Sequence, residues 1–314
     1  MLMLTTVAVV DCSIPINSVY PLTLVFLIVS LVLFNGAAEA GPAAPLWRSA
    51  ALVFGIGAAF GNGVGLVIWP ILLWLGWRGR TGMGWLVAVA VIGVGFTALY
   101  LHGMPHGTPL QAELDSGLFA PGHLRKMADY LLAYLGLPLS RSPGLAVPSR
   151  VFGAALLVAG SACCVWFGLV SRRNGRLERF AVALILVTFG SALLAVLGRT
   201  DLEAEVKIPV RYAVMVAPLH VGLFILALSW IARRVTSLRW RTVTLAAGAS
   251  FALVMLVQQV AAGRAAVTVT DAMRARITAF YAGDRAAATV AAVYPDPVRA
   301  EMLAGKLRER GLVP

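Results

Sequence analysis

Charged residues are scarce in this chain. They make up 13% of its 314 residues, whereas 60% are hydrophobic. Soluble proteins contain about 25% charged and roughly 45–50% apolar residues. The solvated surface of a soluble domain therefore cannot be built from this composition, and a mean hydropathy of +0.85 agrees.

Cysteine is also rare. Cys163 and Cys164 are adjacent and Cys12 stands alone, which excludes a disulfide framework. Carboxylates and lysines are missing from every long apolar run of the chain. Ion and proton pathways usually need such groups within the membrane, so their absence counts against a proton-coupled transporter.

Long apolar runs dominate what is present. They cover residues 19–34, 50–77, 85–101, 151–170, 180–197, 212–231 and 243–262. A membrane-crossing helix needs about 17–25 apolar residues, and barrel strands would instead alternate over about ten. We expect an all-α, polytopic transmembrane bundle of about seven spans over residues 1–262. Residues 263–314 then form a small external helical tail, with Asp296 and Pro297 starting its last helix and Gly311 ending it.

Basic residues outnumber acidic ones by 26 to 14. Ten arginines and one acid lie in three short loops after the second, fourth and sixth runs. The positive-inside rule makes these loops cytoplasmic, so orientation explains the charge without nucleic-acid binding. It also places the N-terminus in the cytoplasm, and the loops 35–49, 102–150 and 199–211 and the tail outside.

The second run is longer than a bilayer requires. Gly57, Gly61 and Gly65 follow at four-residue spacing, which predicts a close-packing helix face. A break near Gly61–Gly65 that lines a cavity is the alternative, because unwound backbone survives at membrane depth only where protein or water satisfies it. We take Asn62 and His102 as candidates to line such a cavity.

The loop 102–150 contains a predicted amphipathic helix over 123–137. Its leucines recur near helical spacing, and Tyr130 and Tyr134 suit the headgroup level. It is expected to lie at the interface, and a lid over an external cavity is its functional interpretation. His102 and His106 in this loop fit no metal motif, so no metal or cofactor is predicted.

The loop 199–211 has an arginine at each end. Arg199 and Arg211 could clamp a phosphate with several hydrogen bonds. They could equally pair with Asp201, Glu203 and Glu205 between them, which requires no ligand. The same three acids are weak candidates for an external general base.

Several short motifs occur in a characteristic order. They are Phe60-Gly61-Asn62-Gly63, Trp69-Pro70, Leu101-His102-Gly103, Tyr130 to Gly136, Gly198-Arg199 and Arg211-Tyr212. Over about half of the chain they resemble a family of bacterial polytopic membrane proteins similar to the C-terminal part of the glycosyltransferase C superfamily. The resemblance implies transfer of a sugar from a polyprenyl-phosphate carrier to envelope glycans at the inner membrane. Arg199 and Arg211 would then bind the carrier phosphate, and Tyr212 would shape that pocket.

One feature of that superfamily is missing. Its enzymes usually place a catalytic acid in the first external loop, whereas here only Asp11 precedes the first run and the loop after it carries Glu39 alone. We therefore expect several N-terminal spans to be absent from this sequence. Whether the chain is an enzyme stays open; a non-catalytic protein that binds lipid or a partner is the alternative, and a transporter or flippase is the third.

Overall fold

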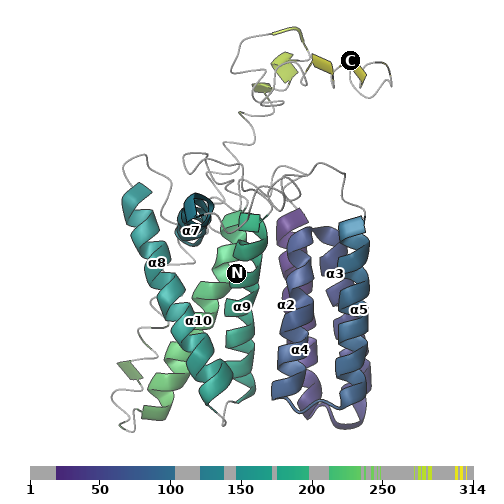
Figure 1. Cartoon of the computed structure of the whole chain (residues 1–314), viewed down its shortest axis with the longest axis vertical. Coiled ribbons are helices and arrows are strands. Elements are labelled where there is room, and N and C mark those ends of the chain that lie inside the picture. The colour runs from purple at the N-terminus through teal and green to yellow at the C-terminus, as the bar shows by residue number, and fades with distance from the viewer. Residues whose placement is uncertain are drawn as a thin grey trace.

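The computed structural model describes residues 19–102, 121–137, 146–171, 175–197 and 212–234, with scattered residues between 237 and 309. This described part is built of helices. Figure 1 shows them as two groups, α2 to α5 and α7 to α10. In chain order they are α2 (Val19–Gly36), η2 (Ala37–Glu39), η3 (Gly41–Ala43), α3 (Ala44–Gly61), η4 (Gly63–Val67), α4 (Ile68–Arg78), α5 (Met83–His102), α7 (Pro121–Leu135), α8 (Ala146–Cys163), the π-helical η7 (Cys164–Val170), α9 (Arg176–Leu197) and α10 (Ala213–Arg234).

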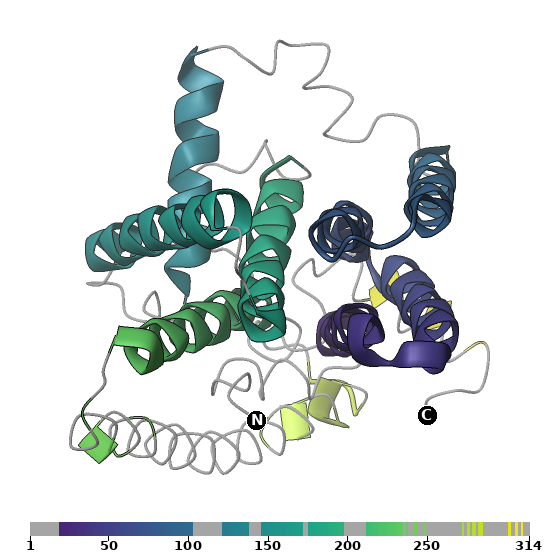
Figure 2. The same ribbon diagram turned by 90° about the horizontal axis from the view of Figure 1, so that it is seen from below.

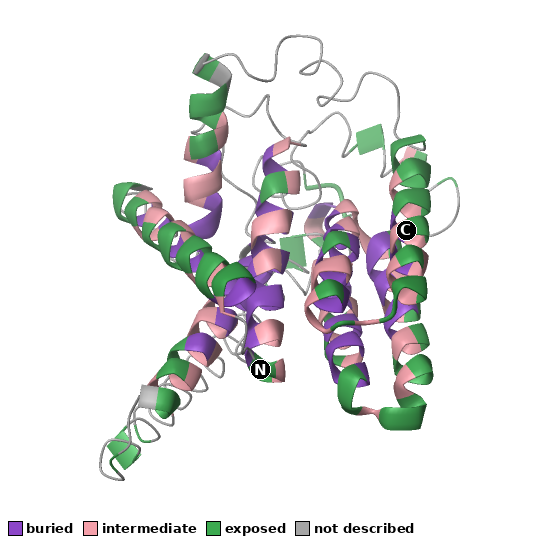
Figure 3. Ribbon diagram, turned by 60° about the horizontal axis from the view of Figure 1, so that its bottom comes forward, coloured by how far each residue is buried: buried purple, intermediate pink, exposed green. Residues whose placement is uncertain are grey.

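The expected transmembrane bundle is confirmed. Within the described residues, six helices are long and apolar enough to cross a membrane, and Gly63–Arg78 is a shorter apolar segment. Their outward faces are apolar as well as exposed, as the exposed residues along α5 show (Figure 3). On α5, Val91 and Val94 are 67% and 70% exposed. Such a surface is stable only against lipid, so the chain is a multi-pass membrane protein.

The second apolar run is not one span. It contains two antiparallel segments, α3 and η4–α4, separated by Asn62. The end of α3 packs against the start of α2, as the contact of Gly61 with Thr23 shows. The end of α4 packs against the end of α2, as the contact of Gly76 with Phe34 shows. The prediction of a single span over 50–77 was therefore wrong, and the break that was the alternative is a reversal of the chain.

The reversal is produced by Asn62 and Gly65. Asn62 is extended (φ −166°, ψ 150°), and its side-chain oxygen accepts a hydrogen bond from the Val64 N–H at 3.0 Å. Its carbonyl accepts a second from the Gly65 N–H at 2.7 Å. A Cβ atom on Gly65 would overlap the carbonyl group of Ala58, so only glycine lets the two segments approach so closely. The returning segment starts as a 3₁₀ helix, which stretches 16 residues to roughly 26 Å, close to a bilayer core.

This hairpin changes the predicted topology. The loop between α2 and α3 now lies beside the basic loops. The Asn35 amide donates to the Arg176 carbonyl at 2.9 Å, Glu39 pairs with Arg176 at 2.9 Å, and Arg78 donates to the Ser171 carbonyl. We call this the arginine end of the bundle and the opposite end the α7 end. The expectation that loop 35–49 lies opposite the basic loops is wrong.

The start of α2 therefore lies at the α7 end, together with the end of α5. A cytoplasmic N-terminal side of α2 and cytoplasmic basic loops cannot both hold. The other described spans match their predictions within a few residues at each end. The last apolar run, 243–262, and the boundary at residue 262 fall almost wholly outside the described residues, so the tail domain stays a prediction.

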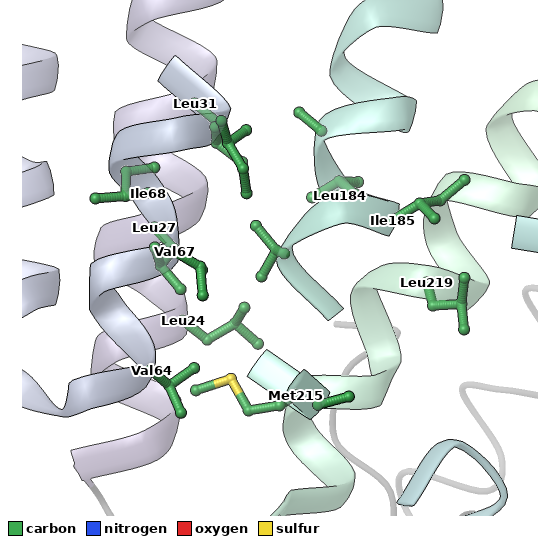
Figure 4. Close-up of a cluster of buried hydrophobic side chains, with 14 of the residues drawn as sticks. Leu24, Leu27, Leu31, Val64, Val67, Ile68, Leu184, Ile185, Met215 and Leu219 are labelled. Carbon is green, nitrogen blue, oxygen red and sulfur yellow. The ribbon is translucent and has the colours of Figure 1, made fainter. Parts of the chain in front are cut away.

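An apolar core joins the two groups of helices (Figure 4). Apolar side chains of α2, the η4–α4 segment, α9 and α10 meet there. Leu27, Ile68 and Ile185 are 0% exposed. Lipid is as apolar as these side chains, so the association depends on close packing more than on exclusion of water. The core fixes how α9 and α10 present their ends at the α7 end.

Candidate functional site at the α7 end

Helix α7 lies across the end of the bundle. Figure 1 shows it end-on beside upright spans, and Figure 2 shows it lengthwise while most spans are seen from their ends. Its range, Pro121–Leu135, agrees with the predicted amphipathic helix over 123–137. Its position agrees with an interfacial helix, which lies in the plane of the membrane surface.

The C-terminal half of α7 is fastened to α8. Arg150 holds Asp129 through two contacts, Nε to Oδ1 at 2.7 Å and a terminal nitrogen to Oδ2 at 2.9 Å. The buried Ser149 hydroxyl donates to the Gly136 carbonyl at 3.0 Å. Close backbone contact completes the junction, since a Cβ on Gly153 would overlap the Leu132 carbonyl. A two-point arginine–carboxylate pair fixes orientation as well as distance, so this half of α7 is held rigidly.

Four tyrosines gather where α7 meets α2 and α10. They are Tyr20, Tyr130, Tyr134 and Tyr212, and we call them the tyrosine cluster. Tyr20 and Tyr212 meet edge to face with ring centres 5.3 Å apart, and the Tyr134 and Tyr212 ring centres are 5.5 Å apart. Tyrosine suits a membrane boundary because the ring is apolar and the hydroxyl is polar. Because Tyr130, Tyr134 and Tyr212 are buried, the cluster forms a packed floor beneath α7 at this end of the bundle.

A chain of hydrogen bonds runs from this floor into the bundle. The Tyr134 hydroxyl donates to Ser191 at 3.3 Å, and Ser191 donates to the Thr188 carbonyl at 2.9 Å. The Thr188 hydroxyl donates to the Met215 carbonyl at 2.9 Å and accepts from the Leu219 N–H at 3.1 Å. Leu219 follows Pro218, which interrupts the hydrogen bonding of α10. Met215 and Leu219 are four residues apart in α10, so the Thr188 hydroxyl bridges the carbonyl and N–H of this pair beside the proline.

The predicted site residues fall partly on the described chain. Tyr212 is 6% exposed and belongs to the tyrosine cluster. Arg199, Arg211, Asp201, Glu203 and Glu205 lie outside the described residues, so their contacts stay predictions. Their loop nevertheless starts and finishes at the α7 end, because it connects the end of α9 to the start of α10.

The two predicted cavity-lining residues have other roles. Asn62 caps the turn between α3 and η4, and His102 is an exposed residue at the end of α5. A groove of about 450 Å³ lies between the η4–α4 segment and α5, and neither Asn62 nor His102 lines it. Trp69, Pro70 and Gly93 are among its apolar lining residues. Such a mostly apolar surface suits a hydrocarbon chain.

A polar cluster at the arginine end was not predicted from the sequence. Glu178, at the start of α9, is 4% exposed and accepts hydrogen bonds from Ser229 and Arg233 of α10. The spacing of these residues along the chain carries no signal for the contact, since the pair forms only when α9 and α10 pack. His220 is also a packing residue: its Nδ1 lies 3.2 Å from the Val216 carbonyl and its ring stacks on Phe152.

No protein-family description, curated protein or solved structure gives a significant match to this chain. Within the described residues, no three His, Cys, Asp or Glu side chains come together in the manner of a metal site. The described polar groups at the α7 end are tyrosine, serine and threonine hydroxyls, the Asp129–Arg150 pair and the exposed Arg125 and Lys126.

The tyrosine cluster can be tested through Tyr134. We expect Tyr134→Phe to lower the free energy of unfolding by about 1 kcal/mol, because a buried hydrogen bond to Ser191 is lost. Tyr100→Phe, at a 39% exposed tyrosine, is the control and should change it little. Thermal unfolding in detergent measures both. Equal stability of Tyr134→Phe and wild type would contradict a stabilising hydrogen bond between Tyr134 and Ser191.

The stability of the protein should also depend on Tyr134 at alkaline pH. Burial raises the pKa of its hydroxyl above the ordinary value of 10.0, so the folded state holds this proton more tightly than the unfolded state. Its contribution is complete below pH 10 and is lost as the pH rises further. Unfolding scans between pH 9 and 11 should show wild type losing stability faster than Tyr134→Phe.

Proposed function

We propose that this chain is a bacterial inner-membrane protein that binds the phosphate of a polyprenyl-phosphate-linked sugar at the α7 end and serves envelope glycan assembly. The observation that carries the proposal is the convergence at one end of the bundle. An interfacial helix, a tyrosine floor and both ends of the loop bearing Arg199 and Arg211 meet there. Guanidinium groups at headgroup level suit a lipid phosphate.

The sidedness in this proposal follows from the basic loops. If the arginine end faces the cytoplasm, the α7 end and the start of α2 face outward. A carrier lipid would present its phosphate at that surface, with its hydrocarbon chain in the bilayer. The groove between α4 and α5 offers an apolar surface for such a chain at the side of the bundle.

Glycosyl transfer is the activity that the resemblance supports, with Asp201, Glu203 or Glu205 as the general base. Binding without catalysis is the second candidate, and one observation favours it. Asp129, the acid described closest to the tyrosine cluster along the chain, is neutralised by Arg150. Both oxygens of this carboxylate contact Arg150, so it is already engaged in an ion pair and does not serve as the general base.

Binding is tested by native mass spectrometry of the full chain in detergent. Polyprenyl phosphate is titrated against wild type, Arg199→Ala and Arg211→Ala. Either substitution should weaken binding about 10- to 100-fold, the effect of losing charge-assisted hydrogen bonds. Arg80→Ala removes an exposed arginine from the opposite end and should bind as wild type. Polyprenol, which lacks the phosphate, should bind weakly to all four proteins.

Equal polyprenyl-phosphate affinity in all four proteins would refute the proposed phosphate site. Turnover separates the two candidates once binding is established. An enzyme would transfer sugar from the polyprenyl carrier, and Asp201→Asn, Glu203→Gln or Glu205→Gln would abolish transfer while the affinity for carrier persists. A protein that binds without catalysis would show the arginine dependence and no transfer in any variant.

A further inference from the structure

The two halves of α7 differ in their surroundings. The C-terminal half is fixed to the bundle, and Tyr134 and Leu135 are 0% exposed. The N-terminal half is open, because Gly122, Leu124, Arg125 and Lys126 are all exposed. Figures 2 and 3 show this half extending away from the other helices. The helix thus projects from the bundle along the plane of the membrane surface.

The charge of the projecting half is uniformly positive. Arg125 and Lys126 form no ion pair within the described residues, and the nearest acid along the helix, Asp129, is held by Arg150. The first turn of α7 contains no acidic residue. The N-terminal end of a helix carries partial positive charge, which adds to that of the two side chains.

An apolar residue lies beside these charges. Leu124 is 44% exposed, and Met127 packs partly against the core. Basic side chains next to an exposed leucine are typical of helices that lie at a bilayer surface with their charges at the phosphates. Soluble partners are disfavoured, because the helix lies at the level where the apolar spans end.

We propose that the N-terminal half of α7 binds anionic phospholipid headgroups of the surrounding bilayer through Arg125 and Lys126. Each basic residue near an anionic surface strengthens its attraction, and two together correspond to an enrichment of up to about 30-fold. This site uses no residue of the proposed carrier site. It holds whether or not the chain binds polyprenyl phosphate.

Photo-crosslinking from position 124 identifies which lipids lie next to the N-terminal half of α7. The full chain with Leu124→p-benzoylphenylalanine is placed in nanodiscs of equal phosphatidylglycerol and phosphatidylcholine with identical acyl chains. Mass spectrometry of the adducts gives the ratio of the two lipids. We expect phosphatidylglycerol to be enriched several-fold to about 30-fold. The double substitution Arg125→Gln and Lys126→Gln should return the ratio close to one.

Two controls keep the result specific. Arg276→Gln with Lys306→Gln removes the same charge from exposed tail residues and should preserve the enrichment. Arg125→Lys with Lys126→Arg keeps both charges and should preserve it too, even if the glutamine variant folds poorly. Equal labelling of the two lipids in wild type would overturn the proposal. So would adducts to protein in place of lipid, or enrichment that persists in a folded glutamine variant.

Discussion

Gly65→Ala is expected to lower the free energy of unfolding by about 3 kcal/mol, the upper range for overpacking a close contact. The added methyl group would overlap the carbonyl group of Ala58, which is backbone and cannot rotate away. The α3–α4 hairpin must open to make room. That movement displaces η4 from α9, where Val64 and Val67 belong to the core between the two groups of helices.

Gly95→Ala is the matched control. Gly95 lies within α5, and a Cβ atom there meets open space. Alanine is the better helix former by about 1 kcal/mol, so the control should be neutral or slightly more stable. Thermal unfolding in detergent and the yield of folded protein measure both variants. A Gly65→Ala protein as stable as the control would contradict the hairpin.

Arg233→Met is expected to have a comparable effect, about 3 kcal/mol. The Glu178 side chain is 6% exposed, whereas that of Arg233 is 49% exposed. Removing the arginine leaves the buried carboxylate without the counterion described for it, and an uncompensated buried charge is strongly destabilising. Glu178→Gln leaves an arginine that can turn to water, so it should lower the unfolding free energy by only about 1 kcal/mol.

The larger loss of stability in Arg233→Met than in Glu178→Gln is the result that shows a buried carboxylate. Combining Glu178→Gln with Arg233→Met should restore most of the stability lost in Arg233→Met, because the buried charge is gone. Arg276→Met, at an exposed arginine of the tail, controls for the change in net charge. Thermal unfolding of the four variants and wild type completes the cycle. Equal losses for Glu178→Gln and Arg233→Met would show that the pair behaves as an exposed one.

Hydropathy predicted the class of fold and most of its spans. A span must be long and apolar wherever it contacts lipid. The sequences of α5, α9 and α10 are long apolar stretches, so these spans can be recognised directly. The amphipathic pattern of α7 was equally readable, because one helix face packs on protein and the other does not. These features depend on local sequence alone.

The hairpin could not be found in this way. Its turn contains no charge and no proline, and Asn62 satisfies the backbone with its own side chain, so hydropathy stays high across the reversal. The length of the second apolar run did indicate a break, since this run is longer than one membrane crossing requires. The predicted topology inherited this error, because one missed reversal moves every earlier segment to the other side.

The candidate site was predicted only in outline. Tyr212 was named for its neighbour Arg211, yet its contacts with Tyr20 and Tyr134 join residues far apart in the chain. Likewise, sequence alone suggested that Asn62 and His102 lined a cavity, whereas one is a cap and the other is exposed. Pairings of this kind arise from packing and leave no local pattern to read.

The uncharged turn at Asn62 has a consequence for how the protein is made. Both outer ends of the α3–α4 hairpin lie at the arginine end, so if that end faces the cytoplasm, only the turn must be carried across the bilayer during synthesis. Carrying a charged residue into the centre of a membrane costs about 2.5–3.5 kcal/mol on insertion scales, and this turn carries none. The hairpin can therefore enter the membrane as one unit from the ribosome, without a separate signal to orient its second helix.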